Sequence, residues 1–596
     1  MNKLSVSIAV IWLACSVAAC SSEPSSTSSD GGSGASGTGA GGSMTGGTPG
    51  GDTGGSPVGG GGSGGSLVGG SGGGPTGGGG SLVGGSGGGP TGGGGSLVGG
   101  SGGNLAGGSG GSPTGGGGGS PTGGVATGGG GGDETGGVPT GGGGGDETGG
   151  VGTGGGSTEP ELVTSAENDY WNTEGQLTEL ASGSADLTID ENTTYQLWDG
   201  FGGTFNEMGW DALQALSQED RDLAIRLLFD PQDGARFVYG RIPIGASDYS
   251  MSYYTLDDLT SGTTDYDMEQ FSLARDKEML IPYIKAALEV RPDLHLWGSP
   301  WIVPDWMLDG RNMRSDAQTL RAHALYFARF VEDYGKEGMT IEAVHLQNEP
   351  GYARLTWNDT VFINFFKTYM GPVFEERGVT AEIWDGTISN PDKANLVTSV
   401  ANDPASMEYV TGFGLQWNHE DTVALVAPFG RVMQTEHRCG NYNFSAKYWD
   451  QSRYSSTTPQ NDHLYGEESW QLIRDWIVGG VNSYCAWNMV LDTQGRSLDG
   501  WPQNALLVVN RSAQSLIPTA AYYVFRHFSY YIVPGATRIG ISGSNDALAF
   551  KNPDGSIVAE IYNSGGSSSS TTVGVGASSY QFDVPAHGWA TLRVVP

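Results

Sequence analysis

The chain has 596 residues, a formal net charge of −35 and 106 glycines, which concentrate before residue 160. A surface with this excess of negative charge repels phosphate backbones, so the composition argues against nucleic acid as a partner. Because so glycine-rich a segment holds few apolar side chains, the N-terminal part of the chain is not expected to form a packed domain.

Residues 1–19 have the pattern of a secretory signal peptide, with one early lysine, an apolar run and small residues before Cys20. The stretch VAAC at 17–20 further resembles a bacterial lipoprotein signal. This resemblance implies that Cys20 is lipidated and that the protein is extracytoplasmic, held at the bacterial outer membrane or cell surface only by that lipid. An ordinary signal peptide cut near the same place is the alternative and would give a secreted protein. No later run is long and apolar enough to span a bilayer.

Residues 20–160 consist almost entirely of Gly, Ser, Thr and Pro and contain exact repeats, such as SLVGGSGGGPTGGGG at 66–80 and again at 81–95. Repeats this short and polar cannot stack into a solenoid core. We therefore expect a disordered tether between an anchor and a folded body. An adhesive tract is the alternative interpretation.

From Trp198 to residue 520, short β-type runs alternate with longer helical patterns, as in a parallel sheet covered by helices. The helical pattern at 217–229 begins with a capping pair, Ser217 and Asp220, and the pattern at 317–335 carries an apolar stripe at helical spacing. Eight β-type runs predict a (β/α)8 TIM barrel rather than an open sheet; they span 198–203, 236–245, 293–299, 341–347, 380–386, 410–417, 431–436 and 481–488.

In such a barrel the loops after the C-terminal ends of the strands converge on one mouth, where the chemistry of the fold is located. Indole faces combined with amide and carboxylate groups suit a sugar, whose C–H faces stack on rings while its hydroxyls need polar partners. Each tryptophan taken alone could instead plug the barrel as part of its core. The candidate residues at the strand ends are Asp248, Ser299, Trp301, Asn348, Glu349, Asp385, Gln416, Trp417, Glu436, Trp487 and Asn488.

Two of these candidates are glutamates: Glu349 ends the fourth run, in HLQNEPGY at 345–352, and Glu436 ends the seventh. Taken alone, Glu349 could simply begin a solvated loop or cap the next helix. Facing Glu436 across a barrel mouth, it suits glycoside hydrolysis, in which one carboxyl protonates the leaving oxygen and the other attacks the anomeric carbon. A separation of about 5–5.5 Å would predict retention of configuration. Burial and mutual repulsion should raise the pKa of the acid, and Pro350 is expected to hold Glu349 in an extended backbone.

The barrel region carries, in this order, the motifs WDGFGG, RIPIGASDYS, LWGSPWIVPDWM, QNEP, QTE and AWN, followed by FRHFSYYIVPGATRIG at 525–540. In these motifs the chain resembles glycoside hydrolase family 30, which includes glucosylceramidases, endo-β-1,6-glucanases and xylan-active enzymes. The resemblance implies that Glu349 is the general acid/base, that Glu436 is the nucleophile and that Asn348 bonds the 2-hydroxyl of the sugar. It also implies contacts with the glycone from Asp248, Trp301 and Trp487.

The substrate is predicted from positions at which the chain differs from particular members of the family that it resembles. After the sixth run the chain has Gln416, Trp417 and Asn418 where human-type glucosylceramidases carry His-Trp-Tyr, and we expect Gln416 and Trp417 to contact substrate. The forms GFGGTFNEMGW, QNEPG and QTEHRCG look closer to bacterial endo-β-1,6-glucanases. A retaining endo-β-1,6-glucanase acting on extracellular glucan is therefore favoured over a glucosylceramidase. A xylan-active enzyme ranks third, because no arginine that would read a glucuronate is identified in the last barrel loop.

Two other classes of protein are alternatives to a glycosidase. A surface glycan-binding protein with a decayed barrel should have lost one catalytic glutamate, whereas both are present. A metal-dependent hydrolase would need a motif such as HxH or HExxH, which the eight histidines do not form. The sequence therefore predicts an enzyme without metal or cofactor, whose partner is a polysaccharide or glycoside substrate and which we expect to be a monomer.

Alternating β-type patterns occur within 161–197 and after residue 540, so 161–197 and 521–596 are predicted to form the β-sandwich of the family. Such a sandwich either braces the barrel or binds carbohydrate. Of the four cysteines, Cys439 and Cys485 lie in the barrel region. A disulfide between them is one hypothesis, and two buried thiols are the other.

Overall fold

A computed structural model describes residues 159–181, 184–351, 355–439 and 461–596. The predicted signal peptide at 1–19, Cys20 and nearly all of the glycine-rich segment lie outside these residues. Within the described ranges, no helix is long and apolar enough to cross a membrane.

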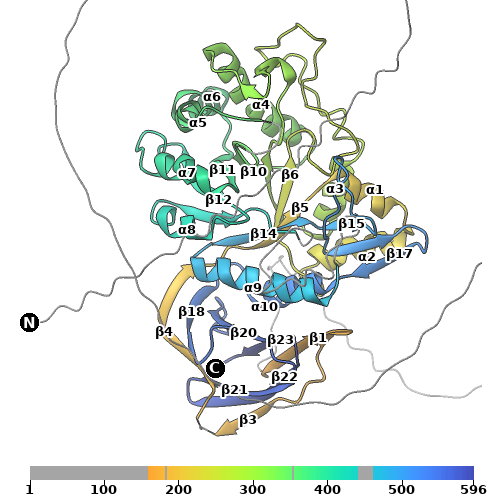
Figure 1. Ribbon diagram of the computed structural model, residues 1–596, viewed down its shortest axis with the longest axis vertical. Coiled ribbons are helices and arrows are strands. Elements are labelled where there is room, and N and C mark those ends of the chain that lie inside the picture. Colours follow the sequence, from red (N-terminus) through yellow and green to blue (C-terminus); the bar gives the residue numbers. More distant parts are fainter. Residues whose placement is uncertain (1–158, 182–183, 352–354, 440–460) are drawn as a thin grey trace, which may run out of the picture. The chain divides into compact units, whose positions relative to one another are not determined.

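Eight parallel strands close into a barrel in the order β10-β11-β12-β13-β14-β5-β6-β7, with helices around it (Figure 1). Each strand overlaps one of the runs identified in the sequence, so the predicted TIM barrel is confirmed. The strands are β5 (Gly200–Thr204), β6 (Tyr239–Pro243), β7 (His295–Ser299), β10 (Ile341–His345), β11 (Glu382–Ile388), β12 (Val410–Leu415), β13 (Arg431–Gln434) and β14 (Ser483–Asn488).

The helices form where the apolar spacing and the caps predict them. Helix α2 (Gln218–Phe229) begins after Ser217, whose hydroxyl accepts the N–H of Asp220, and α4 (Ala317–Lys336) buries most of its apolar stripe. The other helices are α1 (Glu207–Gln214), α3 (Leu280–Val290), α5 (Asp359–Phe365), α6 (Gly371–Arg377), α7 (Ala394–Ala401), α8 (Glu420–Val426), α9 (His463–Gly479) and α10 (Ala520–Tyr531), with short helical segments η1 (Asp305–Met307), η2 (Phe366–Met370) and η3 (Pro391–Lys393).

The second domain is a β-sandwich built from both flanks of the barrel, as the sequence predicts (Figure 1). Its strands follow the order β2-β1-β23-β20-β19-β18-β4-β21-β22-β3. Strand β4 (Leu187–Leu197) precedes the barrel and β18 (Thr537–Ser542) follows it, yet the two pair antiparallel. The others are β1 (Glu161–Ala166), β2 (Asp169–Asn172), β3 (Thr178–Ala181), β19 (Ala547–Lys551), β20 (Ile557–Asn563), β21 (Ser569–Val575), β22 (Ser578–Val584) and β23 (Gly588–Val594).

Two small sheets complete the described secondary structure. One contains β15 (Val490–Asp492), β16 (Leu507–Asn510) and β17 (Ser515–Pro518), and it lies after the last barrel strand in sequence. The other is a hairpin of β8 (Leu308–Asp309) and β9 (Asn312–Met313) in the segment between β7 and α4.

A buried chain of hydrogen bonds ties α10 to the sandwich. His527 of α10 lies 2.8 Å from Ser165 Oγ through Nε2 and 2.7 Å from Thr591 Oγ1 through Nδ1. The Thr591 hydroxyl in turn contacts both carboxyl oxygens of Glu560, at 2.9 and 2.8 Å. These residues are buried and belong to β1, β23 and β20, so one histidine links a helix of the barrel layer to three sandwich strands.

Cys439 and Cys485 are two free, buried thiols, so the disulfide hypothesis is wrong. The reason lies in their packing, because each thiol belongs to a different apolar cluster. Cys439 packs with Trp301 and Trp487, whereas Cys485 lies 4.0 Å from the sulfur of Met433.

Candidate active site

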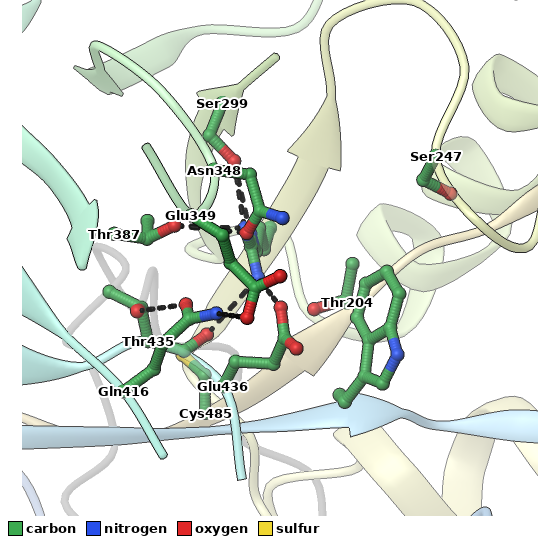
Figure 2. Close-up of polar contacts among 12 residues, drawn as sticks. Thr204, Ser247, Ser299, Asn348, Glu349, Thr387, Gln416, Thr435, Glu436 and Cys485 are labelled. Carbon is green, nitrogen blue, oxygen red and sulfur yellow. Dashed lines mark hydrogen bonds and ion pairs between the residues drawn. The ribbon is translucent and has the colours of Figure 1, made fainter. Parts of the chain in front are cut away.

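The two glutamates lie just past the C-terminal ends of barrel strands, Glu349 after β10 and Glu436 after β13. Their carboxyl groups face one another, and the side chain of Gln416, which follows β12, lies beside both (Figure 2). Strand ends far apart in sequence are thereby brought to one point of the barrel mouth. A pair of facing carboxyls can divide acid and nucleophile roles if their environments differ.

Glu436 is held by two donors. Arg241 Nη1 donates to its Oε2 at 2.6 Å, and the indole N–H of Trp417 donates to its Oε1 at 3.1 Å. Arg241 is fully buried, and its guanidinium also bonds Ser299 Oγ at 3.0 and 3.1 Å. Charge-assisted bonds of this kind favour the ionised carboxylate, which is the form that a nucleophile requires.

Glu349 has the opposite environment. Burial, reinforced by the negative charges of Glu436 and Asp248, raises the pKa of Glu349 from 4.5 to about 8. Burial also raises the pKa of Glu436, but the charge and hydrogen bond of Arg241 and the bond from Trp417 oppose that rise. We therefore assign the proton to Glu349 and the negative charge to Glu436. The sequence predicts the same division, with Glu349 as the acid and Glu436 as the nucleophile.

Asn348 is oriented by neighbours on two other strands. Its Oδ1 accepts from Arg241 Nη2 at 2.6 Å and from Thr387 Oγ1 at 3.0 Å. With the oxygen occupied in this way, the amide nitrogen is turned away from both donors (Figure 2). An amide N–H presented beside the two carboxyls can donate to a sugar hydroxyl.

The backbone of Glu349 corrects one prediction. The sequence predicts that Pro350 keeps Glu349 extended. Instead, Glu349 has φ +47°, in the left-handed region that residues other than glycine rarely adopt. The neighbouring strands impose this conformation, because the N–H of Asn348 bonds Pro300 O at 2.8 Å and the N–H of Glu349 bonds Thr387 O at 2.9 Å. Backbone strain of about 1–3 kcal/mol is typical of residues held in place at functional sites.

The tryptophans predicted to contact the glycone pack against each other. Trp301 and Trp487 stack with ring centroids 5.2 Å apart, and the Arg241 guanidinium lies 4.3 Å from the Trp301 ring. Trp487 also donates from its indole to Gln503 Oε1 at 2.8 Å. Both rings are almost fully buried, so they fix the guanidinium while forming one side of the site. Their contact with sugar stays a prediction.

The remaining candidates differ in where they lie. Gln416 donates from Nε2 to Glu349 Oε1 at 3.2 Å, so it is a direct neighbour of one of the two facing glutamates. Asn488 bonds Asn206 and Gln503 rather than either glutamate. Asp385 is buried with neither carboxyl oxygen hydrogen-bonded, and burial raises its pKa well above the ordinary value. Burial therefore favours the neutral form of Asp385, and among the described residues its carboxyl makes no hydrogen bond to the site.

A cavity of about 500 Å³ lies at the opposite end of the barrel. It is lined by the first residues of several barrel strands, including His295 of β7, Ile341 of β10 and Arg431 of β13. These are N-terminal strand ends, whereas both glutamates follow C-terminal ends. Glu349 and Glu436 therefore lie outside this cavity.

Residues 198–532 match the glycosyl hydrolase family 30 TIM-barrel domain, and residues 535–592 match the β-sandwich domain of the same family. The chain belongs to glycosyl hydrolase family 30. The resemblance seen in the motifs is confirmed, and the protein is a glycosidase whose substrate is a glycoside.

This family 30 enzyme has relatives with different substrates. It is 24% identical to the lysosomal acid glucosylceramidase of Mus musculus over 63% of its own length and 77% of the relative's. It is 25% identical to an endo-1,6-β-D-glucanase of Aspergillus fumigatus, covering 65% of this chain and 83% of the other. The solved structure of the endo-β-1,6-glucanase BT3312 superposes with a TM-score of 0.62 at 23% identity, covering 73% of this chain and 99% of that one.

The residues around the two glutamates that the sequence did not indicate include Arg241, Thr387, Ser389 and Thr435. Arg241 carries a signal that could have been used, because it is a lone charge inside the apolar run FVYGRIPIG at 237–245. A charged side chain there must be paired if it is buried. The two threonines give no such signal, since threonine is common in any strand.

Proposed function

We propose that this enzyme is a retaining β-glycosidase that cleaves β-1,6-linked glucan by double displacement. The observation that carries the proposal is the unequal surroundings of two facing carboxyls: Arg241 donates to Glu436 at 2.6 Å, whereas Glu349 is buried beside the negative charges of Glu436 and Asp248. The linkage rests on the relatives named as endo-1,6-β-glucanases and on the motif forms QNEPG and QTEHRCG.

In the first step, Glu436 attacks the anomeric carbon while Glu349 gives its proton to the glycosidic oxygen. The C–O bond to the leaving sugar breaks, and an ester bond forms between the glycone and Glu436. In the second step, Glu349 is a carboxylate and takes a proton from water, whose oxygen attacks the anomeric carbon and releases Glu436. Arg241 and Trp417 stabilise the carboxylate that leaves, and Asn348 donates to the 2-hydroxyl in both transition states.

Trapping of the covalent intermediate tests the mechanism. A 2-deoxy-2-fluoro glycoside with a good leaving group slows both steps, so Glu436 should be recovered as a glycosyl ester by peptide mass spectrometry. Glu436→Gln is the matched control and should not be labelled. An enzyme that releases product of inverted configuration, with no labelled Glu436, would rule out double displacement.

A substrate panel tests the linkage. Purified enzyme is assayed on β-1,6-glucan, laminarin, glucosylceramide and glucuronoxylan, and cleavage of the first is expected to be fastest. Glucosylceramide is the second candidate, because several relatives, including the mouse enzyme, are named glucosylceramidases. Activity on glucosylceramide without activity on β-1,6-glucan would replace the proposed substrate.

We also propose that Cys20 carries a lipid and holds the enzyme outside the cytoplasm. The support is the sequence pattern of residues 1–20. Mass spectrometry of the N-terminal peptide should find a lipid-modified Cys20, and Cys20→Ser should release the protein from the membrane fraction. An unmodified N-terminus beginning near residue 21 would indicate an ordinary signal peptide instead.

A further inference from the structure

The side chain of Gln416 lies between Glu349 and Thr435, the residue that precedes Glu436. It is fully buried, and its backbone N–H bonds Ile388 O at 2.9 Å. Its Nε2 donates to Glu349 Oε1 at 3.2 Å, and its Oε1 accepts from Thr435 Oγ1 at 2.9 Å. Thr435 immediately precedes Glu436, so one amide joins the acid to the backbone of the nucleophile (Figure 2).

The direction of this amide follows from the charges around it. The amide of Gln416 also lowers the pKa of Glu436 and so favours its ionised form. An amide turned the other way would place its acceptor oxygen against an ionised carboxylate, which is repulsive. With Nε2 toward the carboxyls, the amide donates to Glu349 Oε1 and favours the ionised form of Glu436, while the Thr435 hydroxyl donates to Oε1 of Gln416.

We propose that Gln416 is a positioning residue that occupies Oε1 of Glu349 as a hydrogen-bond acceptor, so that the catalytic proton is held on Oε2, with Thr435 fixing the amide. An amide N–H can only donate, so Oε1 cannot direct a proton toward Gln416. This inference rests on the proposed function, in which Glu349 is the acid.

Other groups also face Glu349 and must be included in its titration. Glu436 and Asp248 raise its pKa, and the Ser389 hydroxyl lowers it together with Gln416. Arg241 is also within electrostatic reach of Glu349. A serine hydroxyl can accept as well as donate, so Ser389 places no restriction on which oxygen carries the proton.

The test compares pH profiles of kcat/KM for wild type, Gln416→Leu and Thr435→Val. Loss of the Gln416 donor disfavours ionised Glu349, so the alkaline limb should move up by about one pH unit in Gln416→Leu. Thr435→Val should move it in the same direction by less, and Thr435→Ser should restore the wild-type profile. Thr387→Val is the matched control: it removes a hydroxyl that bonds Asn348, and it should leave the alkaline limb in place.

A second readout separates proton delivery from general damage. Gln416→Leu should lose about tenfold in kcat on a substrate with a poor alkyl leaving group, and much less on a dinitrophenyl glycoside, which departs without a proton. Equal losses on both substrates, or an unmoved alkaline limb in a folded variant that still labels Glu436, would overturn the inference. Retained turnover of poor leaving groups by Glu349→Gln would instead overturn the proposed function, so the two failures are distinguishable.

Discussion

Arg241 and Glu436 form a buried ion pair at 2.6 Å, with the arginine fully enclosed and the carboxylate 4% exposed. The same guanidinium reaches Ser299 and Asn348, so one side chain connects β6 to residues at the ends of β7, β10 and β13. A buried charge is tolerated only when it is paired and hydrogen-bonded. Arg241 therefore favours the ionised form of Glu436 and orients the amide of Asn348 beside it.

Replacement of Arg241 should damage stability and activity together. Arg241→Met leaves Glu436 buried without its partner, so the free energy of unfolding should fall by about 3–5 kcal/mol in urea titrations. Protonation of the unpaired Glu436 should then remove most of the turnover. Arg241→Lys keeps the charge but not the planar fork, and we expect it to recover more stability than activity. Equal stability of the Met variant and wild type would contradict the role given to the ion pair.

The titration of Glu349 should make the free energy of unfolding depend on pH. The pKa of this carboxyl is about 8 in the fold against an ordinary 4.5, so the folded protein binds the proton more strongly than the unfolded chain does. Its contribution to stability is complete below about pH 4.5 and is lost as the pH rises through about 8. Urea titrations between pH 5 and about 8.5 should therefore show wild type losing stability relative to Glu349→Gln. A difference that is constant across this range would contradict the raised pKa.

The barrel could be predicted because each strand is short, apolar and separated from the next by a helical pattern. Patterns of this kind are local, so each of the eight barrel strands can be predicted from its own stretch of sequence. The sandwich could be predicted from the alternation within 161–197 and after residue 540, whereas β18 begins before that tail, at Thr537, within the family motif that ends at residue 540.

The details of the site depend on contacts between distant strands, and these were not predictable. The left-handed backbone of Glu349 results from bonds to Pro300 O and Thr387 O, which outweigh the local preference set by Pro350. The role of Arg241 likewise depends on where β6 lies relative to β13. Local sequence identified the two glutamates, whereas their different protonation states come from tertiary structure.

Trp417→Phe should distinguish the contribution of the indole N–H to activity from that of ring packing. The variant loses the donor to Glu436 Oε1, which disfavours the ionised carboxylate and should move the acidic limb of kcat/KM to higher pH. A hydrogen bond to a charged group contributes about 1.5–3 kcal/mol, so kcat should fall roughly 10- to 100-fold. Trp487→Phe is the matched control, because its indole donates to Gln503 and its loss should leave the acidic limb in place. Identical pH profiles for the two variants would contradict this assignment.

His527 should be required for docking of α10 on the sandwich. His527→Phe keeps a ring of similar size but leaves Ser165 and Thr591 without their buried partner. The Ser165 and Thr591 hydroxyls each lose one buried hydrogen bond that contributes about 0.5–1.5 kcal/mol, so the free energy of unfolding should drop by about 1–3 kcal/mol. His295→Phe is the control, because this histidine is 47% exposed and its bond to Glu342 is a surface contact that contributes about 1 kcal/mol or less. Because burial lowers the pKa of His527 to about 3, the ring stays neutral and the loss should be the same at pH 6 and pH 8. A stability loss confined to one of these pH values would indicate that the ring is charged, and it would contradict the neutral hydrogen-bond chain that links α10 to β1 and β23.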